Sequence, residues 1–326
     1  MSCLKSKIVL ISPAAVEANN GNWHTAYRWA KFLSGHCDIA ITQVWNTADI
    51  DSALMIALHA RRSAASIHAW AAQRPGRPLV LVLTGTDLYR DIQSDASARQ
   101  SLYLATHLVV LQEAGLAALP ANLQGKTRVI YQSAARLKTA SKSTQRFTAV
   151  MVGHLRDEKD PLTFMKAAAL CKSKNTRFEQ IGDGLDAALA SAATRATAQP
   201  NYRWLGGLPR FETRQRIKRA HVLVNSSIME GGAHVILEAV QSGTPVLASR
   251  ISGNVGMLGS GYAGYFEVGD AAGLAALVKR CATEPAFLAH LQNQCAQRAE
   301  LFEPAVEKRL VLNLVASALK DSHERP

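Results

Sequence analysis

The stretch MEGGAHVILEA (residues 229–239) places two glutamates, Glu230 and Glu238, eight residues apart. An apolar run on each side, at 221–227 and 244–249, is typical of a buried strand bounded by turn residues. Three small residues lie between the first glutamate and an apolar helical pattern: Gly231, Gly232 and Ala233. The stretch therefore predicts a strand, a loop that carries a carboxylate, and a helix that begins beside it.

Such a helix start favours an anionic ligand, because exposed backbone N–H groups and the helix dipole attract phosphate. Residues without bulky side chains let the ligand come close to the backbone. We expect Glu238 to accept hydrogen bonds from sugar hydroxyls and Glu230 to face the other end of the ligand. On the alternative interpretation, Glu230 is a charge at a helix start and Glu238 lies on a solvated helix face.

Strand-like and helical segments alternate along the whole chain, which predicts an α/β protein with parallel sheets. In the first half we expect strands within 7–13, 37–44, 52–60, 77–85, 104–112 and 127–133. In the second half we expect them within 146–153, 176–184, 201–208, 221–227 and 244–250. The segment 135–145 is rich in Ser, Thr and Lys, lacks an apolar period and is the best candidate for a linker.

Composition narrows the possible functions and the compartment. The formal net charge is +12, but Lys and Arg are dispersed without a long basic block, so phosphorylated small substrates explain the charge better than nucleic acid does. No apolar run reaches the length of about 18 residues that a membrane span needs. The five cysteines are scattered, which favours reduced thiols in a cytoplasmic protein over disulfides or a zinc site.

The E-x7-E spacing of Glu230 and Glu238 resembles the signature of GT-B glycosyltransferases of the family 4 type, which use nucleotide-sugars. The segment VGHLRDEKDP (152–161) resembles the G-R-L-x-x-x-K segment of that family, whose Arg and Lys bind the donor diphosphate. Lys159 matches the Lys, whereas His154 stands at the Arg position and Arg156 is a candidate for the missing charge. Alternatively, Asp157 or Asp160 caps a helix with Pro161 in its first turn, and the two basic residues Arg156 and Lys159 are exposed to solvent.

This resemblance implies a GT-B fold, in which two Rossmann-like, doubly wound domains face a central cleft and ligands bind at the carboxyl ends of the strands. It divides the chain into an acceptor-side domain (1–140), a domain that binds the nucleotide-sugar (146–303), and a terminal helix (304–326) that crosses back to the first domain. The resemblance further implies that the amides of Gly232, Ala233 and His234 neutralise the donor diphosphate together with Lys159. No metal cofactor is then required.

Three further turns are similar to donor-side segments of the family. The G-x-G turn lies within IGDGL (181–185), the segment beside the nucleobase is NYRWLGGLP (201–209), and the glycine loop of the first domain contains Asn19, Asn20, Gly21 and Asn22. Ordinary turn and helix-cap chemistry accounts for each of these segments as well.

Polar residues follow two expected strands of the first domain. Thr84 stands where family members often carry a His beside the C6 end of the sugar, and Asp87 and Arg90 are further candidates for polar groups in the cleft. We expect Glu230, Thr84 and Asp87 to serve the reacting sugar.

His59, Arg61 and Arg62 follow the third expected strand. Two arginines at this position are not a feature of ordinary family members. Guanidinium groups bind phosphate-like oxyanions through two hydrogen bonds at once. These three residues are our candidates for the acceptor site. Alternatively, the arginines form a solvated helix face and His59 is structural.

Longer stretches resemble one branch of the family, the selenosugar synthases of selenoneine biosynthesis: ALHARRSAASI, VLTGTDLYRDI, GHLRDEKDP, MEGGAHV and ASRISGNVGMLG. The branch implies transfer of a sugar from UDP-glucose or UDP-N-acetylglucosamine to selenophosphate, with formation of a C–Se bond and release of UDP. Glu230 would orient C1 of the sugar, and Glu238 would bind the ribose. The alternatives are another small acceptor, a UDP-sugar epimerase of the same fold, or a protein that binds nucleotides without catalysis. The preferred sugar, the anomeric outcome and the oligomeric state stay open.

Overall fold

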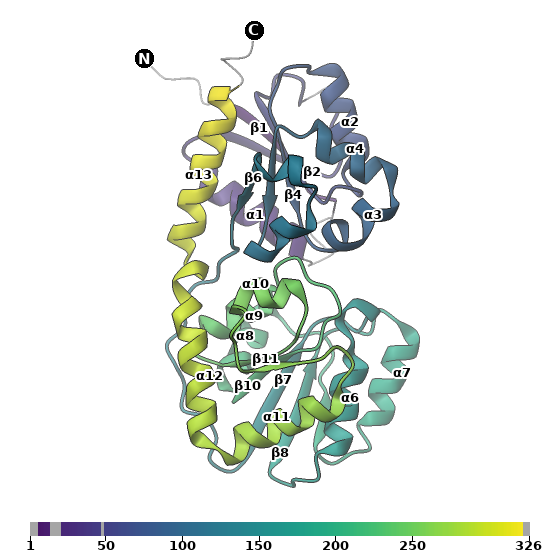
Figure 1. Cartoon of the computed structure of the whole chain (residues 1–326), viewed down its shortest axis with the longest axis vertical. Coiled ribbons are helices and arrows are strands. Elements are labelled where there is room, and N and C mark those ends of the chain that lie inside the picture. The colour runs from purple at the N-terminus through teal and green to yellow at the C-terminus, as the bar shows by residue number, and fades with distance from the viewer. Residues whose placement is uncertain (1–5, 14–20, 47–48, 322–326) are drawn as a thin grey trace. The chain divides into compact units, whose positions relative to one another are not determined.

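The computed structural model describes residues 6–13, 21–46 and 49–321. Contacts divide the chain into two compact units, Met1–Gln132 with Pro304–Pro326 and Ser133–Glu303. Each unit contains a six-stranded parallel sheet with helices on its faces (Figure 1). The α/β architecture expected from the alternation of segments is therefore confirmed.

The first unit has the strand order β2-β1-β3-β4-β5-β6. Its strands are β1 (Lys7–Ile11), β2 (Asp38–Thr42), β3 (Leu54–Leu58), β4 (Leu79–Leu83), β5 (His107–Val110) and β6 (Thr127–Val129). Its helical segments are α1 (Gly21–Leu33), α2 (Ala64–Gln73), η3 (Asp87–Asp91), α3 (Ile92–Ser94), α4 (Ala96–Leu104), η4 (Glu113–Ala118), α5 (Ala121–Gln124) and α13 (Pro304–Asp321).

The second unit has the strand order β12-β11-β10-β7-β8-β9. Its strands are β7 (Phe147–Val152), β8 (Thr176–Ile181), β9 (Tyr202–Trp204), β10 (Val222–Asn225), β11 (Val246–Ser249) and β12 (Tyr265–Phe266). Its helical segments are η5 (Asp157–Lys159), α6 (Pro161–Leu170), α7 (Ala187–Ala196), α8 (Arg210–Arg219), α9 (His234–Val240), α10 (Ser252–Leu258), α11 (Ala271–Thr283), α12 (Pro285–Arg298) and η6 (Ala299–Phe302).

All eleven expected strands are present, and β12 is the strand that the sequence did not predict. It has only two residues, so it is too short to show a period of its own. The expected linker is also irregular, since residues 130–146 form neither helix nor strand. Within the ranges that the structure covers, no helix combines the length and the apolar character that crossing a bilayer requires.

Apolar side chains of the first sheet pack on both of its faces. Along β1, Val9 and Ile11 enter one buried cluster, and Ile8 and Leu10 enter the other. Successive side chains of a strand point to opposite faces, so a sheet covered on both sides requires continuous apolar runs. This requirement explains why the central strands β1, β3 and β4 are almost continuously apolar.

A buried ion pair joins α13 to α1. Glu307 is fully buried, and it accepts hydrogen bonds from Arg28 Nε at 2.8 Å, Arg28 Nη2 at 3.1 Å and Trp29 Nε1 at 2.8 Å. The apolar side of α13, including Val311 and Leu314, joins the same cluster as Trp29. The C-terminal helix is thus part of the core of the first unit.

Replacing Glu307 with Ala should lower the free energy of unfolding by about 3 kcal/mol, because it leaves the Arg28 guanidinium and a buried indole N–H without their acceptor. Urea denaturation followed by circular dichroism would measure the change. Lys308→Ala is the matched control, since Lys308 is exposed on the same helix. Equal midpoints for the two variants would contradict this account of α13.

Candidate active site

The strand order of the second sheet changes direction between β7 and β10. These two strands are hydrogen-bonded neighbours, although three α-helices, the short η5 and two strands separate them in sequence. In doubly wound sheets, ligands bind beyond the carboxyl ends of the strands at this point. The loop after β7 carries Lys159, and the loop after β10 carries Glu230. Their side chains meet there, with Lys159 Nζ 2.5 Å from Glu230 Oε1.

The carboxylate of Glu230 lies in a largely buried, polar environment. Its side chain is 10% exposed, and it accepts hydrogen bonds from Ser227 Oγ at 2.7 Å and Asn225 Nδ2 at 3.4 Å. Burial raises the pKa of Glu230, but the charge and hydrogen bond of Lys159 and the two further hydrogen bonds outweigh burial, so the pKa lies below its ordinary value. Glu230 is therefore an anion at neutral pH, held in one orientation.

A second layer of hydrogen bonds fixes the loop that carries Glu230. Asn254 Nδ2 donates to Asn225 Oδ1 at 3.1 Å and to the Ser249 carbonyl oxygen at 3.0 Å. Ser249 Oγ donates to the Ser227 carbonyl oxygen at 2.5 Å. The residues come from the ends of β10 and β11 and from α10, so the neighbouring strand positions the loop.

Glycine is required where α10 approaches this loop. A Cβ atom on Gly253 would lie 2.0 Å from the carbonyl oxygen of Glu230. A similar approach joins the ends of β7 and β8, where a Cβ on Gly182 would lie 2.0 Å from the Gly153 carbonyl oxygen, at a φ of 143°. Both glycines let backbone segments pack closely around the Lys159–Glu230 pair.

Glu238 lies in α9 and is 5% exposed, so the interpretation that it faces solvent is wrong. His234 Nδ1 lies 3.4 Å from Glu238 Oε1, and two arginines of α8 approach the same oxygen, Arg210 Nη2 at 3.5 Å and Arg214 Nε at 3.9 Å. Burial raises the pKa of Glu238, but His234 and then the two arginines lower it below its ordinary value. Arg214 also donates through Nη2 to the carbonyl oxygen of Ala135 in the segment between β6 and β7.

The helix α9 begins at His234, after Gly231, Gly232 and Ala233, as expected. No side chain among the described residues caps this start. The helix is only seven residues long, so its dipole is small.

His154 does not carry the charge of the arginine that it replaces. Its Nδ1 accepts a hydrogen bond from the backbone N–H of Asp183 at 3.2 Å. Burial lowers the pKa of His154, an effect that Asp183 opposes and that the charges of Arg156 and Lys159 reinforce. Arg156 is exposed. The neighbouring Asp160 caps α6 by accepting from the Thr163 N–H at 3.2 Å, so the helix cap that we weighed for this segment is confirmed.

In the first unit, Asp87 joins the loops that follow β3 and β4. Its carboxylate is fully buried and accepts hydrogen bonds from three backbone N–H groups, those of Ala60, Thr84 and Gly85, at 2.8–2.9 Å. The hydroxyl of Thr84 lies 3.5 Å from the same carboxylate. These contacts make Asp87 a residue that positions the two loops. The role in catalysis that we expected for Thr84 and Asp87 stays a prediction.

His59 and Arg61 come together with Asp91, whereas the side chain of Arg62 does not join them. The side chain of His59 is buried, and its backbone adopts the left-handed conformation with a φ of 73°. Arg61 Nε lies 2.8 Å from Asp91 Oδ2. Arg62 is exposed, and its backbone N–H donates to His59 Nδ1 at 3.3 Å. Sequence reasoning missed Asp91, Arg210 and Arg214, since only the fold brings them to their partners.

Gly21 and Asn22 form the start of α1, and the carbonyl of Gly21 accepts a hydrogen bond from Thr25 Oγ1 at 2.8 Å. Asn19 and Asn20, expected in the same loop, lie outside the described residues. Their part in donor binding stays a prediction.

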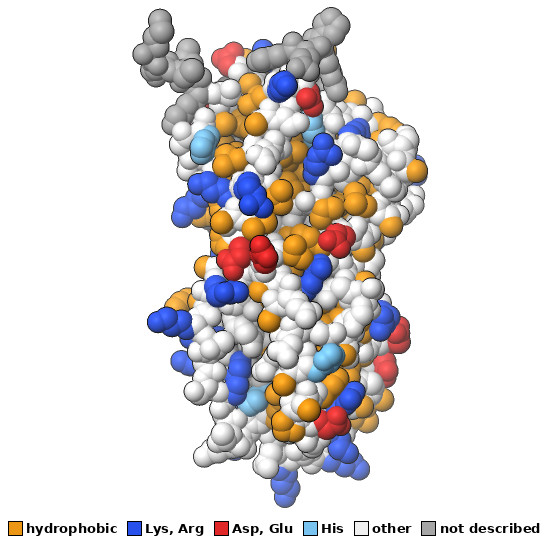
Figure 2. All heavy atoms as spheres, turned by 60° about the vertical axis from the view of Figure 1, so that its left-hand side comes forward, with side chains coloured by type: hydrophobic (Ala, Val, Ile, Leu, Met, Phe, Trp, Pro, Cys, Tyr) orange, Lys and Arg blue, Asp and Glu red, His pale blue; other side chains and the backbone are white. Residues whose placement is uncertain are grey.

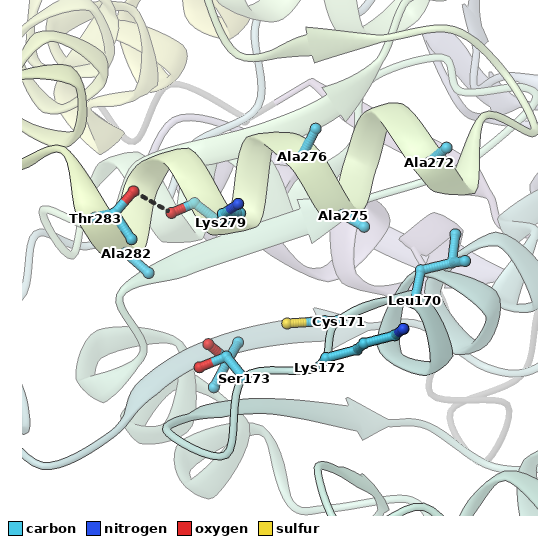
Figure 3. Close-up of a pocket in the computed structure, with 11 residues that line it drawn as sticks. Leu170, Cys171, Lys172, Ser173, Ala272, Ala275, Ala276, Lys279, Ala282 and Thr283 are labelled. Carbon is cyan, nitrogen blue, oxygen red and sulfur yellow. Dashed lines mark hydrogen bonds between the residues drawn. The ribbon is translucent and has the colours of Figure 1, made fainter.

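A cavity of about 520 Å³ lies away from this edge of the second sheet (Figure 3). It is lined by the end of α6, the start of β8 and one face of α11, including Leu170, Thr176 and Ala276. Because the strands are parallel, the start of β8 lies at the edge opposite to Lys159 and Glu230. We therefore do not assign this cavity to the candidate active site.

Positive charge is spread over the surface. Figure 2 shows one face of the molecule, on which Lys and Arg side chains stand in small groups among uncharged ones and form no single continuous patch. This dispersal agrees with the sequence, in which the basic residues are not clustered.

Replacing Gly253 with Ala should destabilise the protein by about 1–3 kcal/mol, because the new methyl group must displace the backbone of Glu230. Denaturant unfolding would measure this loss. Gly261→Ala is the matched control, since a Cβ there meets nothing within 4 Å. If the two variants were equally stable, the close approach of α10 to the Glu230 loop would be disproved.

The chain is similar to several solved structures. HepE of Anabaena, in complex with UDP and glucose, gives a TM-score of 0.77 at 18% identity, covering 96% of this chain and 100% of that chain. Sucrose-phosphate synthase from Thermosynechococcus elongatus gives 0.78 at 15% identity, covering 97% and 100%. The lipopolysaccharide outer core galactosyltransferase WaaB gives 0.70 at 13% identity, covering 95% and 99%. At these identities the likeness shows the fold alone, and it is the GT-B fold expected from the sequence.

A family model described as "Glycosyl transferases group 1" matches residues 134–302, which is more than half of the chain and contains Lys159, Glu230 and Glu238. The match spans the second unit almost from end to end. The chain therefore belongs to the glycosyl transferases group 1 family.

Proposed function

We propose that this protein transfers the sugar of UDP-glucose or UDP-N-acetylglucosamine to selenophosphate, forming a C–Se bond and releasing UDP. The observation that carries the donor part is the oriented, ionised Glu230 beside Lys159 at the point where the second sheet reverses. Structures of HepE hold UDP with glucose, or UDP-glucose, which supports a UDP-sugar as donor. The selenophosphate part rests on the resemblance of the sequence stretches described above.

The donor would lie along the carboxyl ends of β7 and β10. Lys159, with Arg156 and the amides of 231–234, would neutralise the diphosphate, and Glu238 would accept hydrogen bonds from the ribose. We also propose Gly21, Asn22 and His154 as donor-side contacts, with His154 contributing polarity instead of charge. In the structure Lys159 Nζ donates a hydrogen bond to Glu230 Oε1. Donor binding would therefore give each of them a new partner, a phosphate oxygen for Lys159 and a sugar hydroxyl for Glu230.

The reaction balances without a redox partner. A lone pair of the selenium forms the new bond to C1, while the bond between C1 and the diphosphate oxygen breaks and its electron pair leaves with UDP. Negative charge grows on the departing oxygen, so the fixed cation of Lys159 stabilises the transition state more than the ground state. Because selenium in selenophosphate is already anionic, the step needs no general base.

The acceptor would bind to the first unit, at the carboxyl end of β3. His59, Arg61 and Arg62 supply cationic and polar groups there, and Thr84 would contact the sugar. Asp87 acts through the loops that it fixes. We propose that no metal ion is required, since side-chain cations neutralise the diphosphate.

The decisive experiment incubates the full chain with each UDP-sugar, with and without selenophosphate, and analyses the products by mass spectrometry. We expect UDP and a selenium-bearing sugar only when both substrates are present, and equal rates after treatment with EDTA. Conversion of the UDP-sugar without any acceptor would instead identify an epimerase. UDP release that selenophosphate does not stimulate, but another small acceptor does, would overturn the proposed acceptor.

Separate variants should distinguish the roles of Glu230 and Glu238. Glu230→Gln should reduce kcat by about 100-fold, because it weakens the contact that orients C1, while the Kd for UDP stays within about threefold. Glu238→Gln should raise the Kd for UDP about tenfold, because one charge-assisted hydrogen bond is lost. Steady-state kinetics and calorimetry would measure both.

The control for these variants is Glu212→Gln, which changes an exposed glutamate of α8. It should leave both quantities unchanged. If Glu230→Gln weakened UDP binding as much as turnover, Glu230 would belong to the nucleotide site and not to the sugar site.

A further inference from the structure

The donors around Glu230 all reach the same oxygen of its carboxylate. Lys159 Nζ, Ser227 Oγ and Asn225 Nδ2 donate to Oε1, at 2.5, 2.7 and 3.4 Å. The other oxygen, Oε2, accepts no hydrogen bond from the residues that the structure describes, and it is not one of their fully buried atoms that lack a partner. The side chain is 10% exposed. One oxygen of the carboxylate is therefore anchored, and the other is open to solvent.

We propose that Glu230 binds the sugar of the donor through Oε2, and that Asn254 is a positioning residue, which keeps Oε1 anchored by fixing the Asn225 amide with its NH2 group toward Glu230. This inference rests on the proposed function, of which it needs only the UDP-sugar donor and not the acceptor. It gives a role in orienting the sugar to a residue that is itself 0% exposed.

The direction of each amide follows from backbone groups, whose role as donor or acceptor is fixed. The Ser249 carbonyl oxygen lies 3.0 Å from one end of the Asn254 amide, so that end is the NH2 group. The same NH2 group lies 3.1 Å from the nearer end of the Asn225 amide, which must then be the oxygen. The backbone N–H of Ser227, 3.4 Å from this oxygen, requires the same orientation. The other end of Asn225 is therefore the NH2 group that faces Glu230.

A reversed Asn225 amide would be unfavourable at both of its ends. Its oxygen would face the carboxylate of Glu230, with no hydrogen between the two acceptors, and its NH2 group would face that of Asn254. Buried donors and acceptors that lose their partners destabilise the arrangement that contains them. The hydrogen bonds therefore transmit the direction set by the Ser249 carbonyl group to Glu230.

The network is buried and joins three elements of the second unit. Asn254 and Ser249 are 0% exposed, and Asn225 is 3% exposed. Ser249 ends β11, and Asn225 ends β10. Asn254 lies in α10, which packs directly on the backbone of Glu230 at Gly253. Side chains that packing already holds lose little further freedom when a substrate is oriented.

The contacts at Oε1 also determine which ligand suits Oε2. Burial raises the pKa of Glu230, but the charge of Lys159 and the hydrogen bonds at Oε1 outweigh it, so the pKa lies below its ordinary value. Oε2 is thus an oxygen of an ionised carboxylate, which accepts hydrogen bonds and donates none. A sugar hydroxyl, which can donate, is a matching partner.

The first test compares the Kd for UDP with the Kd for UDP-glucose by calorimetry on the full chain, and then with that for UDP-N-acetylglucosamine. The ratio isolates the sugar contact, because UDP lacks the sugar. Asn254→Asp should raise the Kd for the UDP-sugar about tenfold and leave the Kd for UDP within about twofold, because the new carboxylate repels Asn225 Oδ1 and reverses the amide. Asn225→Asp should act in the same direction, since it places an oxygen against Glu230.

Two further variants serve as comparisons. Asn254→Ala should raise the Kd for the UDP-sugar only about threefold, because Asn225 keeps the Ser227 N–H and is not driven to reverse. Asn175→Asp, which changes an exposed asparagine, is the matched control and should leave both Kd values unchanged. Thermal melts followed by circular dichroism would show whether each variant folds. If Asn254→Asp does not fold, Asn225→Asp and Asn254→Ala provide the same comparison.

The second test asks whether Asn254 acts through Asn225. In an Asn225→Ala background no amide is left to reverse, so adding Asn254→Asp should change the ratio of the two Kd values by less than about twofold. In the transfer reaction, Asn254→Asp alone should lower kcat about tenfold and leave the KM for the acceptor unchanged. A purely structural role for Asn254 would weaken UDP and UDP-sugar equally.

The outcomes separate this inference from the proposed function. If Asn254→Asp weakens UDP and UDP-sugar equally, leaves both unchanged, or keeps its full effect in the Asn225→Ala background, the positioning role is wrong, whereas formation of the selenosugar tests the function independently. If the Kd ratio changes as expected but no selenosugar forms, the positioning role stands and the proposed acceptor is wrong. If the native chain binds neither UDP-sugar, both proposals are wrong.

Discussion

The ion pair between Lys159 and Glu230 is the constraint on which the second unit depends. A buried carboxylate without a partner is strongly unfavourable, so it must be neutralised by a cation and by hydrogen bonds. Lys159 supplies the cation from the loop after β7, and Ser227 and Asn225 supply hydrogen bonds from the end of β10. The loops after two strands that are distant in sequence therefore have to meet where the sheet reverses.

Both units use the same physical device. Glu238 lies buried among Arg210, Arg214 and His234, and Asp91 lies buried between Arg61 and Arg90. In each cluster the carboxylate is hidden, whereas Arg210, Arg61 and Arg90 are about half exposed. A buried anion of this kind holds long, flexible arginine side chains in place.

The sequence predicted what depends on local pattern, and missed what depends on contacts between distant segments. Apolar runs of the right length predicted eleven strands, and the turn residues after one of them predicted that Glu230 lies at a strand end and Glu238 in the helix that follows. Lys159 was predicted from the resemblance of its segment to the family. No local signal distinguishes Arg90, which binds Asp91, from Arg62, whose side chain has no such anchor among the described residues. The strand β12 was missed because its two residues are too few to show an alternating or continuous apolar pattern.

The burial of Glu307 has a practical consequence for anyone who wishes to study the first unit alone. Its sheet and the helix that completes its core are encoded at opposite ends of the chain. A fragment that stops at Gln132 would leave the guanidinium of Arg28 and the indole of Trp29 without their carboxylate, and would bare the apolar surface that α13 covers. A single proteolytic cut cannot release this unit intact, whereas a circular permutant that begins at Pro304 would keep its pieces contiguous.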